Sequence, residues 1–344
     1  MRYRLLQLIG LFVVMAMTSS CAAHSASGYE VVYSLESQHH QASSEPSDVA
    51  LHQGLLTIAM VGRNNGPYFA NAEEGAREAA TQLNVEVTFD HPEPPTAQQQ
   101  IEVVEQLIKK EVDVIAISAI DPEKLVPVLV KAQNHGIRVV TWDADTMLKG
   151  REFFVNQVDT EALGRHLMDN MAQAMGETGK FVVISGMHND AKSSELLKWI
   201  EVQADEYYPD MKLELVEVAA DLKGVLTSKS DIGGVIDLYS MDEAAAAEAV
   251  KQAGQAGHVK VTGLYSPSVI SKYLRDGSVQ AATLWSPKKL GYVTVALANG
   301  LASGTYPTDG QDVPGVGTIR MLGNTVIMDE PIDFTRENVN QYDF

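Results

Sequence analysis

The chain has 344 residues, which at about 150 residues per domain is enough for two domains. Acidic residues outnumber basic ones 45 to 26, and the formal net charge is −19. This balance argues against a nucleic-acid-binding protein, because gripping phosphate backbones requires clustered Lys and Arg. The single cysteine, Cys21, excludes an internal disulfide framework and a cysteine-based zinc cluster. A hydrophobic fraction of 45% predicts a folded body with an acidic surface.

The first twenty residues are typical of a secretory signal. A basic start is followed by an apolar run from Leu5 to Met17, and small residues come next. The apolar run is shorter than the roughly 20 residues that a membrane-spanning helix needs. We therefore expect residues 1–20 to be a signal peptide that directs export.

Cys21 follows this segment directly. Its position resembles a bacterial lipobox, in which the cysteine is acylated and becomes the first residue of the mature protein. The alternative is simple cleavage near Ala23 with an incidental cysteine. Residues 21–54 are rich in Ser, His, Gln and Glu and have little periodicity, so we expect a flexible tether. Cys21 is then the lipid anchor that holds the folded body at a membrane.

The rest of the chain alternates short apolar runs with amphipathic stretches. The predicted strands are Leu55–Val61, Val85–Phe89, Val112–Ser118, Ile137–Trp142, Gly179–Ser185, Lys212–Val218, Val235–Leu238, Val259–Leu264 and Val279–Leu284. The predicted helices are Phe69–Leu83, Ala97–Lys110, one opened by Asp121-Pro122 and ending near His135, Ser193–Tyr208, Asp242–Ala253, Pro267–Asp276 and Leu290–Leu301. Such alternation favours the α/β class, here two doubly wound lobes, each with a parallel sheet covered on both faces.

Searches for catalytic and cofactor motifs return little. The chain has no GxxxxGK[ST] phosphate loop, no GxGxxG after the first strand, no GxSxG elbow and no HExxH. Asp143 and Asp145 flank one residue, a spacing that acid–base chemistry or a metal can use, but successive residues of an extended segment point to opposite sides. We therefore expect no enzyme activity, no metal and no cofactor, with an exported enzyme kept as an alternative.

Ligand recognition is the stronger interpretation, because ligands of doubly wound sheets bind beyond the carboxyl ends of the strands. Carboxylates, amides and a basic group beside aromatic rings suit a polyhydroxylated ligand, whose hydroxyls donate and accept while its C–H face packs on a ring. The candidate ligand-binding residues at the predicted strand ends are Arg63, Asn64, Asn65, Tyr68, Phe69, Asp143, Asp145, Gln157, Lys192, Tyr239 and Trp285.

Several segments resemble a known family. They are VDVIAISAIDPEKLVPVLVKAQNHG from Val112, IRVVTWDAD, REFFVNQVD, LYSPSVISKYLRDGSVQAATLWSPKKLG from Leu264, and the closing TRENVNQYDF. They are similar to the type I periplasmic sugar-binding proteins of ABC transporters, and most similar to the rhamnose-binding and autoinducer-2-binding branch. The resemblance implies that Asp143 is the branch's ligand-binding aspartate and that Arg63 lies on or next to a ligand-contacting basic residue.

The second half departs from that branch. Lys192-Ser193 falls where an Asp-Gln or Asn-Gln pair is usual, Tyr239-Ser240 replaces a Pro-Asp-Ala turn, and Ser286 replaces an acidic residue. About ten residues are missing between Val218 and Val235, which leaves a helical stub near Asp221–Ser228. Such a deletion is expected to uncover one sheet face or to force a rearranged packing.

The resemblance implies two lobes joined by a three-segment hinge, made of residues 55–158 with 287–327 and of residues 159–286 with 328–344. The expected function is capture of a small sugar or sugar-like ligand between the lobes, by a monomer that delivers it to an ABC transporter. Autoinducer-2 sensing with a transporter or sensor kinase is the alternative. The expected location is the periplasm or the outer face of the cell membrane. A sugar-responsive transcription regulator would need a helix-turn-helix where this chain has its signal and tether.

Overall fold

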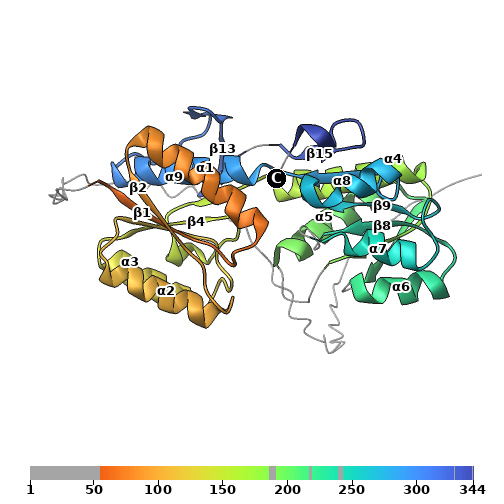
Figure 1. The fold of residues 1–344 in the computed structure, drawn as a ribbon, viewed down its shortest axis with the longest axis horizontal. Helices are drawn as coiled ribbons and strands as arrows, with labels where there is room; N and C mark the ends of the chain where they lie inside the picture. The colour runs from red at the N-terminus through yellow and green to blue at the C-terminus, as the bar shows by residue number, and fades with distance from the viewer. Residues whose placement is uncertain (1–54, 186–190, 217–218, 239–242, 329, 343) are drawn as a thin grey trace, which may run out of the picture. The chain divides into compact units, whose positions relative to one another are not determined.

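The computed structural model describes residues 55–185, 191–216, 219–238, 243–328, 330–342 and 344 (Figure 1). The predicted signal peptide, Cys21, the tether and Tyr239 lie outside these residues, and so does the side chain of Lys192. No helix in this part of the chain has both the length and the apolar character needed to cross a membrane.

The first sheet has seven strands in the order β13-β14-β5-β4-β3-β1-β2. Its strands are β1 (Thr57–Val61), β2 (Glu86–Asp90), β3 (Val114–Ile117), β4 (Arg138–Trp142), β5 (Phe154–Asn156), β13 (Arg320–Leu322) and β14 (Thr325–Ile327). All pairs are parallel except β13 with β14. Helices α1 (Pro67–Leu83) and α9 (Pro287–Ala302) cover one face, and α2 (Ala97–Lys109) and α3 (Val126–Asn134) cover the other (Figure 1). Strand β3 is fully buried, as expected for a strand of a parallel sheet covered on both sides.

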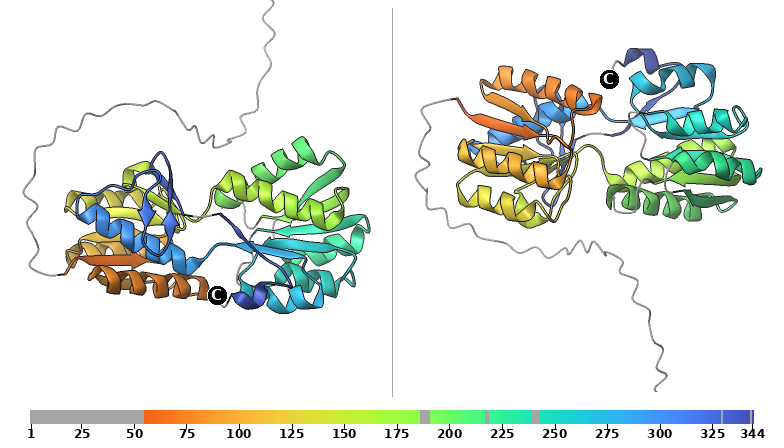
Figure 2. Two further views of the ribbon diagram at one scale, coloured as in Figure 1. Left: turned by 90° about the horizontal axis from the view of Figure 1, so that it is seen from above. Right: turned by 60° about the horizontal axis from the view of Figure 1, so that its bottom comes forward.

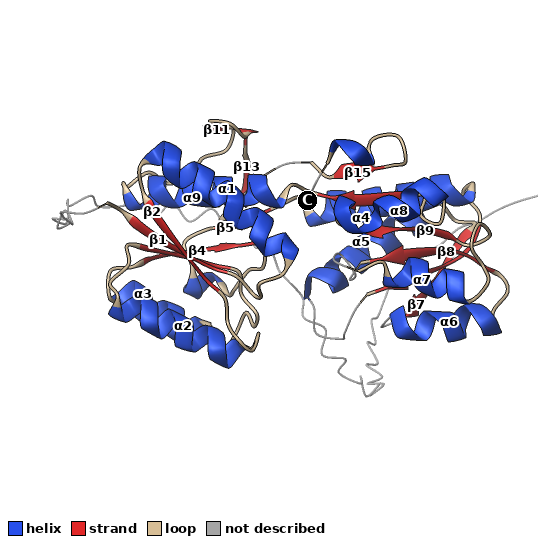
Figure 3. Ribbon diagram, in the orientation of Figure 1, coloured by secondary structure: helices blue, strands red, loops and turns tan. Residues whose placement is uncertain are grey.

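The second sheet has six strands in the order β15-β10-β9-β8-β6-β7, with only β15 antiparallel to its neighbour. Its strands are β6 (Gly179–Ile184), β7 (Met211–Val216), β8 (Ile232–Asp237), β9 (Lys260–Leu264), β10 (Ala281–Leu284) and β15 (Ile332–Phe334). The helices packed around it are α4 (Thr160–Met175), α5 (Ala191–Tyr207), α6 (Ala219–Ser228), α7 (Ala245–Gln252) and α8 (Pro267–Asp276) (Figures 2 and 3). Short elements complete the described chain: η1 (Leu148–Gly150), β11 (Asp312–Val313), β12 (Gly317–Thr318) and η2 (Val339–Gln341).

The sequence-based prediction of an α/β fold with two mainly parallel sheets is confirmed. The chain passes between the sheets three times: after β5, after β10 and after β14. The patterns in the sequence did not predict β5, α4 or the short strands beyond residue 311. These strands are only two or three residues long, too short to show a period in sequence.

The helix predicted to open at Asp121-Pro122 begins instead at Val126. The Asp121 carboxylate accepts hydrogen bonds from the backbone N–H groups of Glu123 (3.1 Å) and Lys124 (3.0 Å). Asp121 therefore caps a turn that precedes the helix. An Asp followed by Pro favours both structures, and here the turn forms.

The predicted stub is a helix of ten residues, α6, and the expectation of an uncovered sheet face is wrong for its described side chains. Leu222 and Leu226 are buried in the main apolar core. Helix α6 packs against α7 and against the edge strand β7. A helix of ten residues therefore packs beside the edge strand of the second sheet.

Helices α1 and α9 approach so closely that glycine is required where they touch. A Cβ atom on Gly75 would lie 1.8 Å from the Lys288 carbonyl oxygen, and one on Gly291 would lie 1.8 Å from the Ala72 carbonyl oxygen. Both helices begin with a proline, Pro67 and Pro287, whose fixed φ suits the first helical position. The contact brings the first turn of α1 to the end of β10, where the candidate site lies.

Candidate functional site

Asp143 directly follows β4 and adopts a left-handed backbone conformation, with a φ of 62°. Asp is one of the few non-glycine residues that tolerate this region. Its side chain is 3% exposed. A buried carboxylate in an unusual conformation at a strand end is a common feature of binding sites.

The Asp143 carboxylate has four partners. Its Oδ1 accepts hydrogen bonds from the Tyr68 hydroxyl (3.0 Å) and from Gln157 Nε2 (2.5 Å). Its Oδ2 accepts one from Ser118 Oγ (2.8 Å) and forms an ion pair with Arg63 Nη2 (3.1 Å). A carboxylate offers about four acceptor positions, so these contacts use its full capacity.

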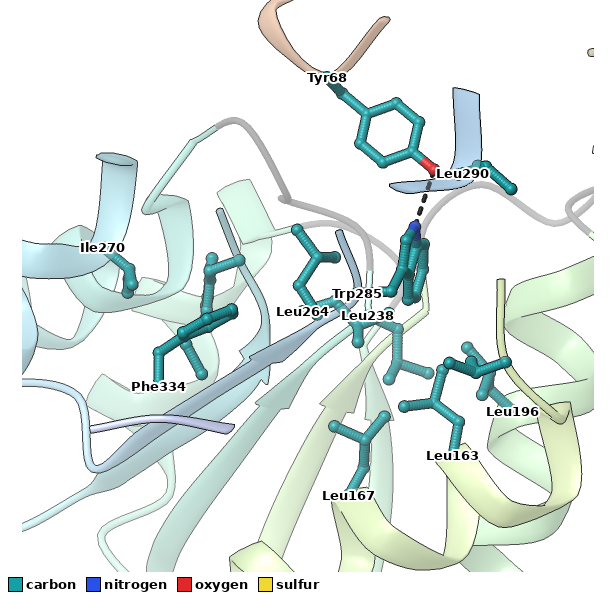
Figure 4. Packing of buried hydrophobic residues seen from close by; sticks show 14 of the residues in the cluster. Tyr68, Leu163, Leu167, Leu196, Leu238, Leu264, Ile270, Trp285, Leu290 and Phe334 are labelled. Atoms are coloured by element: carbon teal, nitrogen blue, oxygen red, sulfur yellow. Dashed lines mark hydrogen bonds between the residues drawn. The ribbon is translucent and has the colours of Figure 1, made fainter. Parts of the chain in front are cut away.

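The Tyr68 hydroxyl connects this carboxylate to Trp285. It donates to Asp143 and accepts from Gln157 Nε2 (3.2 Å) and from Trp285 Nε1 (2.8 Å), the last of which is drawn in Figure 4. The rings of Tyr68 and Trp285 meet edge to face, with centroids 6.4 Å apart. Burial, together with the Asp143 charge, raises the pKa of Tyr68 well above its usual value. The hydroxyl therefore stays a donor throughout the physiological pH range.

Arg63 is the most exposed member of this group, with a side chain 38% accessible. Its guanidinium lies 5.9 Å from the ring centroid of Phe69. Phe69 is buried and packs edge to face against Trp142, 5.6 Å away, and against Tyr68. We call Arg63, Tyr68, Ser118, Asp143, Gln157 and Trp285 the Asp143 cluster.

Asp145 belongs to a different network from Asp143. Both of its oxygens bind Arg151, with Oδ2 2.6 Å from Nη2 and Oδ1 3.0 Å from Nε. Oδ1 also accepts from Thr141 Oγ1 (2.5 Å) and from the Thr146 N–H (2.8 Å). The side chain of Arg151 is 4% exposed, and its Nη1 reaches the Asn324 carbonyl oxygen (3.1 Å). This part-buried ion pair fixes the segment between β4 and β5, so the carboxylates of Asp143 and Asp145 belong to separate networks.

The remaining sequence-predicted residues lie at different depths. Asn64 and Asn65 are exposed between β1 and α1, and the Asn64 side chain accepts from the Gly66 N–H (2.9 Å) in a local turn. Trp285 is buried, at 1% exposure. Tyr239 and the Lys192 side chain lie outside the described residues, so their predicted roles stay predictions.

The second sheet contains a buried carboxylate that the sequence analysis missed. Asp237 is the last residue of β8, and Tyr265 directly follows β9. The Tyr265 hydroxyl donates a hydrogen bond to Asp237 Oδ2 (3.0 Å). Both residues are fully buried, and burial with the Asp237 charge raises the pKa of Tyr265 well above its usual value. The signal is an acidic residue inside the apolar run VIDL, which by itself predicts only a strand. Ser118 is among the strand-end positions at which a ligand is expected, but it is not one of the predicted ligand-binding residues.

A family model described as periplasmic binding protein domain matches residues 57–305. This is most of the chain. The protein belongs to this family of periplasmic binding proteins. Members of the family act outside the cytoplasm, so the protein is extracytoplasmic, and the predicted resemblance to sugar-binding proteins of ABC transporters is confirmed at the level of the family.

Two curated relatives of this periplasmic binding protein carry names of sugar or polyol ligands. The D-ribose/D-allose-binding protein of Pseudomonas aeruginosa is 26% identical over 267 residues, which cover 71% of this chain and 81% of the relative. The xylitol-binding protein of Mycolicibacterium smegmatis is 24% identical over 276 residues, which cover 77% of this chain and 76% of the relative.

Solved structures agree on the fold. A Clostridium phytofermentas ABC transporter solute-binding protein with bound L-rhamnose has a TM-score of 0.76 and 25% identity, and the match covers 85% of this chain and 99% of that one. LsrB from Clostridium saccharobutylicum in complex with AI-2 has a TM-score of 0.74 and 22% identity, covering 84% and 100%. Among the described residues of this protein, no group of three or more His, Cys, Asp or Glu is placed to hold a metal ion.

Proposed function

We propose that this periplasmic binding protein captures a neutral sugar or polyol and delivers it to an ABC transporter. The observation that carries the proposal is the pair of Arg63 and Asp143, in which a partly exposed arginine side chain contacts a buried carboxylate at the carboxyl ends of β1 and β4. The charges of the pair cancel, which favours a neutral ligand over a sugar acid. The names of the relatives, D-ribose, D-allose, xylitol and L-rhamnose, belong to the same chemical class.

The chemistry of the pair suits a hydroxyl-rich ligand. Each sugar hydroxyl both donates and accepts a hydrogen bond, so it needs an acceptor such as Asp143 and a donor such as Arg63. Hydrogen bonds to charged groups contribute about 1.5–3 kcal/mol each. Asn64 and Asn65, exposed beside Arg63, offer further amide donors and acceptors.

A ligand that reaches Asp143 has to replace one of its four partners. Tyr68, Ser118 and Gln157 are buried, whereas the Arg63 side chain is 38% exposed. We therefore propose that a ligand hydroxyl takes the place of Arg63 on Oδ2 and that Arg63 turns its donors toward the ligand. Asp145 has no part in this proposal, because Arg151 already binds both of its oxygens.

We also propose that residues 55–158 with 287–327 and residues 159–286 with 328–344 form two lobes that close on the ligand. The three passages of the chain between the sheets support this division, since short connections allow hinge closure without unfolding either core. A ligand bound better by the closed form shifts the equilibrium toward it. Lys192, Tyr239 and Trp285 are the proposed contributions from the second lobe. A membrane permease would recognise the closed monomer.

A ligand screen tests the proposal. Melting temperature and calorimetric heat are measured with D-ribose, D-allose, L-rhamnose, xylitol and autoinducer-2. A ligand at 100 times its dissociation constant adds about 2.7 kcal/mol to the free energy of unfolding. Binding of at least one neutral sugar or polyol is the expected result. Binding of autoinducer-2 alone would favour a signalling role, no binding of any of them would contradict the proposal, and a sugar converted during incubation would indicate an enzyme.

A further inference from the structure

The Tyr68 hydroxyl lies between two residues that the proposed function treats separately. Its single hydrogen points to Asp143 Oδ1, and its oxygen accepts from Trp285 Nε1 and Gln157 Nε2. A hydroxyl has one donor and two acceptor positions, so all three are in use. The oxygen can keep all of these contacts only while its hydrogen points to the Asp143 carboxylate.

We infer that Tyr68 is a positioning residue, whose hydroxyl makes the hydrogen bond of Trp285 depend on what the Asp143 carboxylate binds. The inference rests on the proposed function, because it takes Asp143 as the residue that the ligand engages. It extends that function by naming the hydrogen bonds that link Asp143, after β4, to Trp285, after β10.

The surroundings of Tyr68 leave only the hydroxyl hydrogen free to reorient. The Tyr68 side chain is buried, and its ring packs edge to face against Phe69. It also meets the ring of Trp285, which is 1% exposed (Figure 4). Its helix, α1, packs on α9 with the two backbones in close contact at Gly75 and Gly291. A change at Asp143 therefore reaches Trp285 through the direction of one O–H bond.

Trp285 lies where the chain passes between the two sheets, so its hydrogen bond with Tyr68 links the first sheet's site to this passage. Trp285 follows β10 of the second sheet and precedes α9, which packs on the first sheet. The chain passes from one sheet to the other at this residue. When a ligand hydroxyl replaces Arg63, the Asp143 carboxylate loses its positive partner, and the strength of its hydrogen bond with Tyr68 changes. The hydrogen bond between Tyr68 and Trp285, which lies where the chain passes between the sheets, changes with it.

Indole N–H resonances of the ligand-free protein provide a direct test. The chain has three tryptophans, and Trp285→Phe assigns the Trp285 signal in a ¹H–¹⁵N spectrum. Tyr68→Phe removes the acceptor and is expected to move the Trp285 resonance upfield. The matched control is Tyr292→Phe, because the Tyr292 hydroxyl also joins α9 to α1, by donating to Gln82 Oε1 at 2.6 Å, but lies outside the Asp143 cluster. The control should leave the Trp285 resonance in place.

A double substitution shows whether Asp143 affects Trp285 through the Tyr68 hydroxyl or through a general change in the structure. Asp143→Asn should shift the Trp285 resonance in the wild-type background and leave the Trp199 resonance unchanged. In the Tyr68→Phe background the same substitution should no longer shift Trp285. Equal shifts in both backgrounds, or no shift from Tyr68→Phe, would overturn the inference. If Tyr68→Phe does not fold, Asp143→Asn alone decides, because an unmoved Trp285 signal contradicts the coupling.

Ligand titration then distinguishes this inference from the proposed function. With D-ribose, L-rhamnose and xylitol as probes, Tyr68→Phe should weaken binding roughly tenfold, since it leaves buried polar groups without their partner. It should also abolish the ligand-induced shift of Trp285, whereas Tyr292→Phe should bind normally and keep that shift. If no sugar binds the wild-type protein, the proposed function fails, and the ligand-free spectra still decide whether Tyr68 couples Asp143 to Trp285.

Discussion

Trp285 donates its indole N–H to the Tyr68 hydroxyl over 2.8 Å, although 217 residues separate the two in sequence. Tyr68 lies in the first turn of α1, and Trp285 directly follows β10 of the second sheet. The same hydroxyl donates to Asp143. One hydrogen-bonded chain thus joins Asp143, the residue proposed to bind a ligand, to the point where the polypeptide passes between the sheets.

Asp143→Asn should weaken sugar binding by at least tenfold, because it removes the charge that pairs with Arg63 and replaces one acceptor oxygen by an NH₂ donor. It should also lower the free energy of unfolding by about 1–3 kcal/mol, the cost of disrupting buried hydrogen bonds. Calorimetry and urea denaturation measure the two effects.

Asp145→Asn is the matched control for this substitution. It breaks an ion pair with the buried Arg151 and should lower stability by a similar or larger amount. Its effect on affinity should stay within about twofold, since among the described residues its carboxylate binds only groups near β4 and β5. An affinity loss as large as that of Asp143→Asn would assign ligand contact to both aspartates.

Arg63→Met should reduce affinity by about tenfold or more while changing stability little. The Arg63 side chain is 38% exposed, and partly exposed ion pairs contribute only about 0–1 kcal/mol. Arg77→Met serves as the comparison, because Arg77 also stacks on an aromatic ring, that of Phe89, and is distant from the Asp143 cluster. Isothermal titration with the best ligand of the screen measures both variants, and equal affinity in both would remove Arg63 from the site.

The sequence predicted most of the fold because the alternation of apolar runs and amphipathic stretches is a local signal. It also pointed to Asp143, which any strand-end search finds. Arg63, Tyr68, Gln157 and Trp285 were also among the predicted site residues, but their mutual contacts could not be predicted. The contact between Tyr68 and Trp285, for example, depends on how closely α1 approaches α9. The failure at Asp237 has a different origin: an acidic residue inside an apolar strand was not recognised as a buried polar group that needs the Tyr265 hydroxyl.

Cys21→Ala tests the proposed lipid anchor, which lies outside the described residues. If Cys21 is acylated, the wild-type protein should partition with membranes and the variant should be released to the soluble fraction. Fractionation of cells that express each form, followed by immunoblotting, measures the difference. Equal partitioning of both forms would favour simple signal cleavage near Ala23.

His166 and Asp333 connect α4 to β15, with His166 Nε2 2.8 Å from Asp333 Oδ2. The hydrogen bond to Asp333 raises the pKa of His166, and the Asp169 and Glu330 charges add to this effect. Burial opposes ionisation of Asp333, but hydrogen bonds from His166, Thr283 and Asn170 outweigh it and lower the pKa of that carboxyl. The two ionised groups therefore stabilise each other.

The sign of the pH dependence follows from these directions. Because the pKa of His166 is raised on folding, its ion pair adds to the free energy of unfolding. This stabilisation is complete below the pKa of the unfolded state, about 6.5, and is lost as pH rises through the pKa of the folded state. Because the pKa of Asp333 is lowered on folding, its stabilising effect is present above the pKa of the unfolded state, about 3.9. It is lost as pH falls through the pKa of the folded state. The stability difference between wild type and His166→Gln should thus be larger at pH 5.5 than at pH 8.5. Urea denaturation at both values measures it, and a difference independent of pH would contradict the ion pair.

Gly75→Ala should destabilise the protein by about 3 kcal/mol or more, because its methyl group would meet the Lys288 carbonyl and force α1 away from α9. The comparison is Gly224→Ala in α6, where an added Cβ meets no atom of the described residues within 4 Å apart from its own helix. There the substitution should leave stability unchanged or raise it by up to about 1 kcal/mol through helix propensity. Because the α1–α9 contact holds Tyr68 against Trp285, Gly75→Ala should also move the Trp285 indole resonance, and Gly224→Ala should not. If both variants melt at the wild-type temperature, the close approach of the two helices does not hold these residues together, and the Tyr68–Trp285 contact must be maintained by the hydrogen bonds of the Asp143 cluster alone.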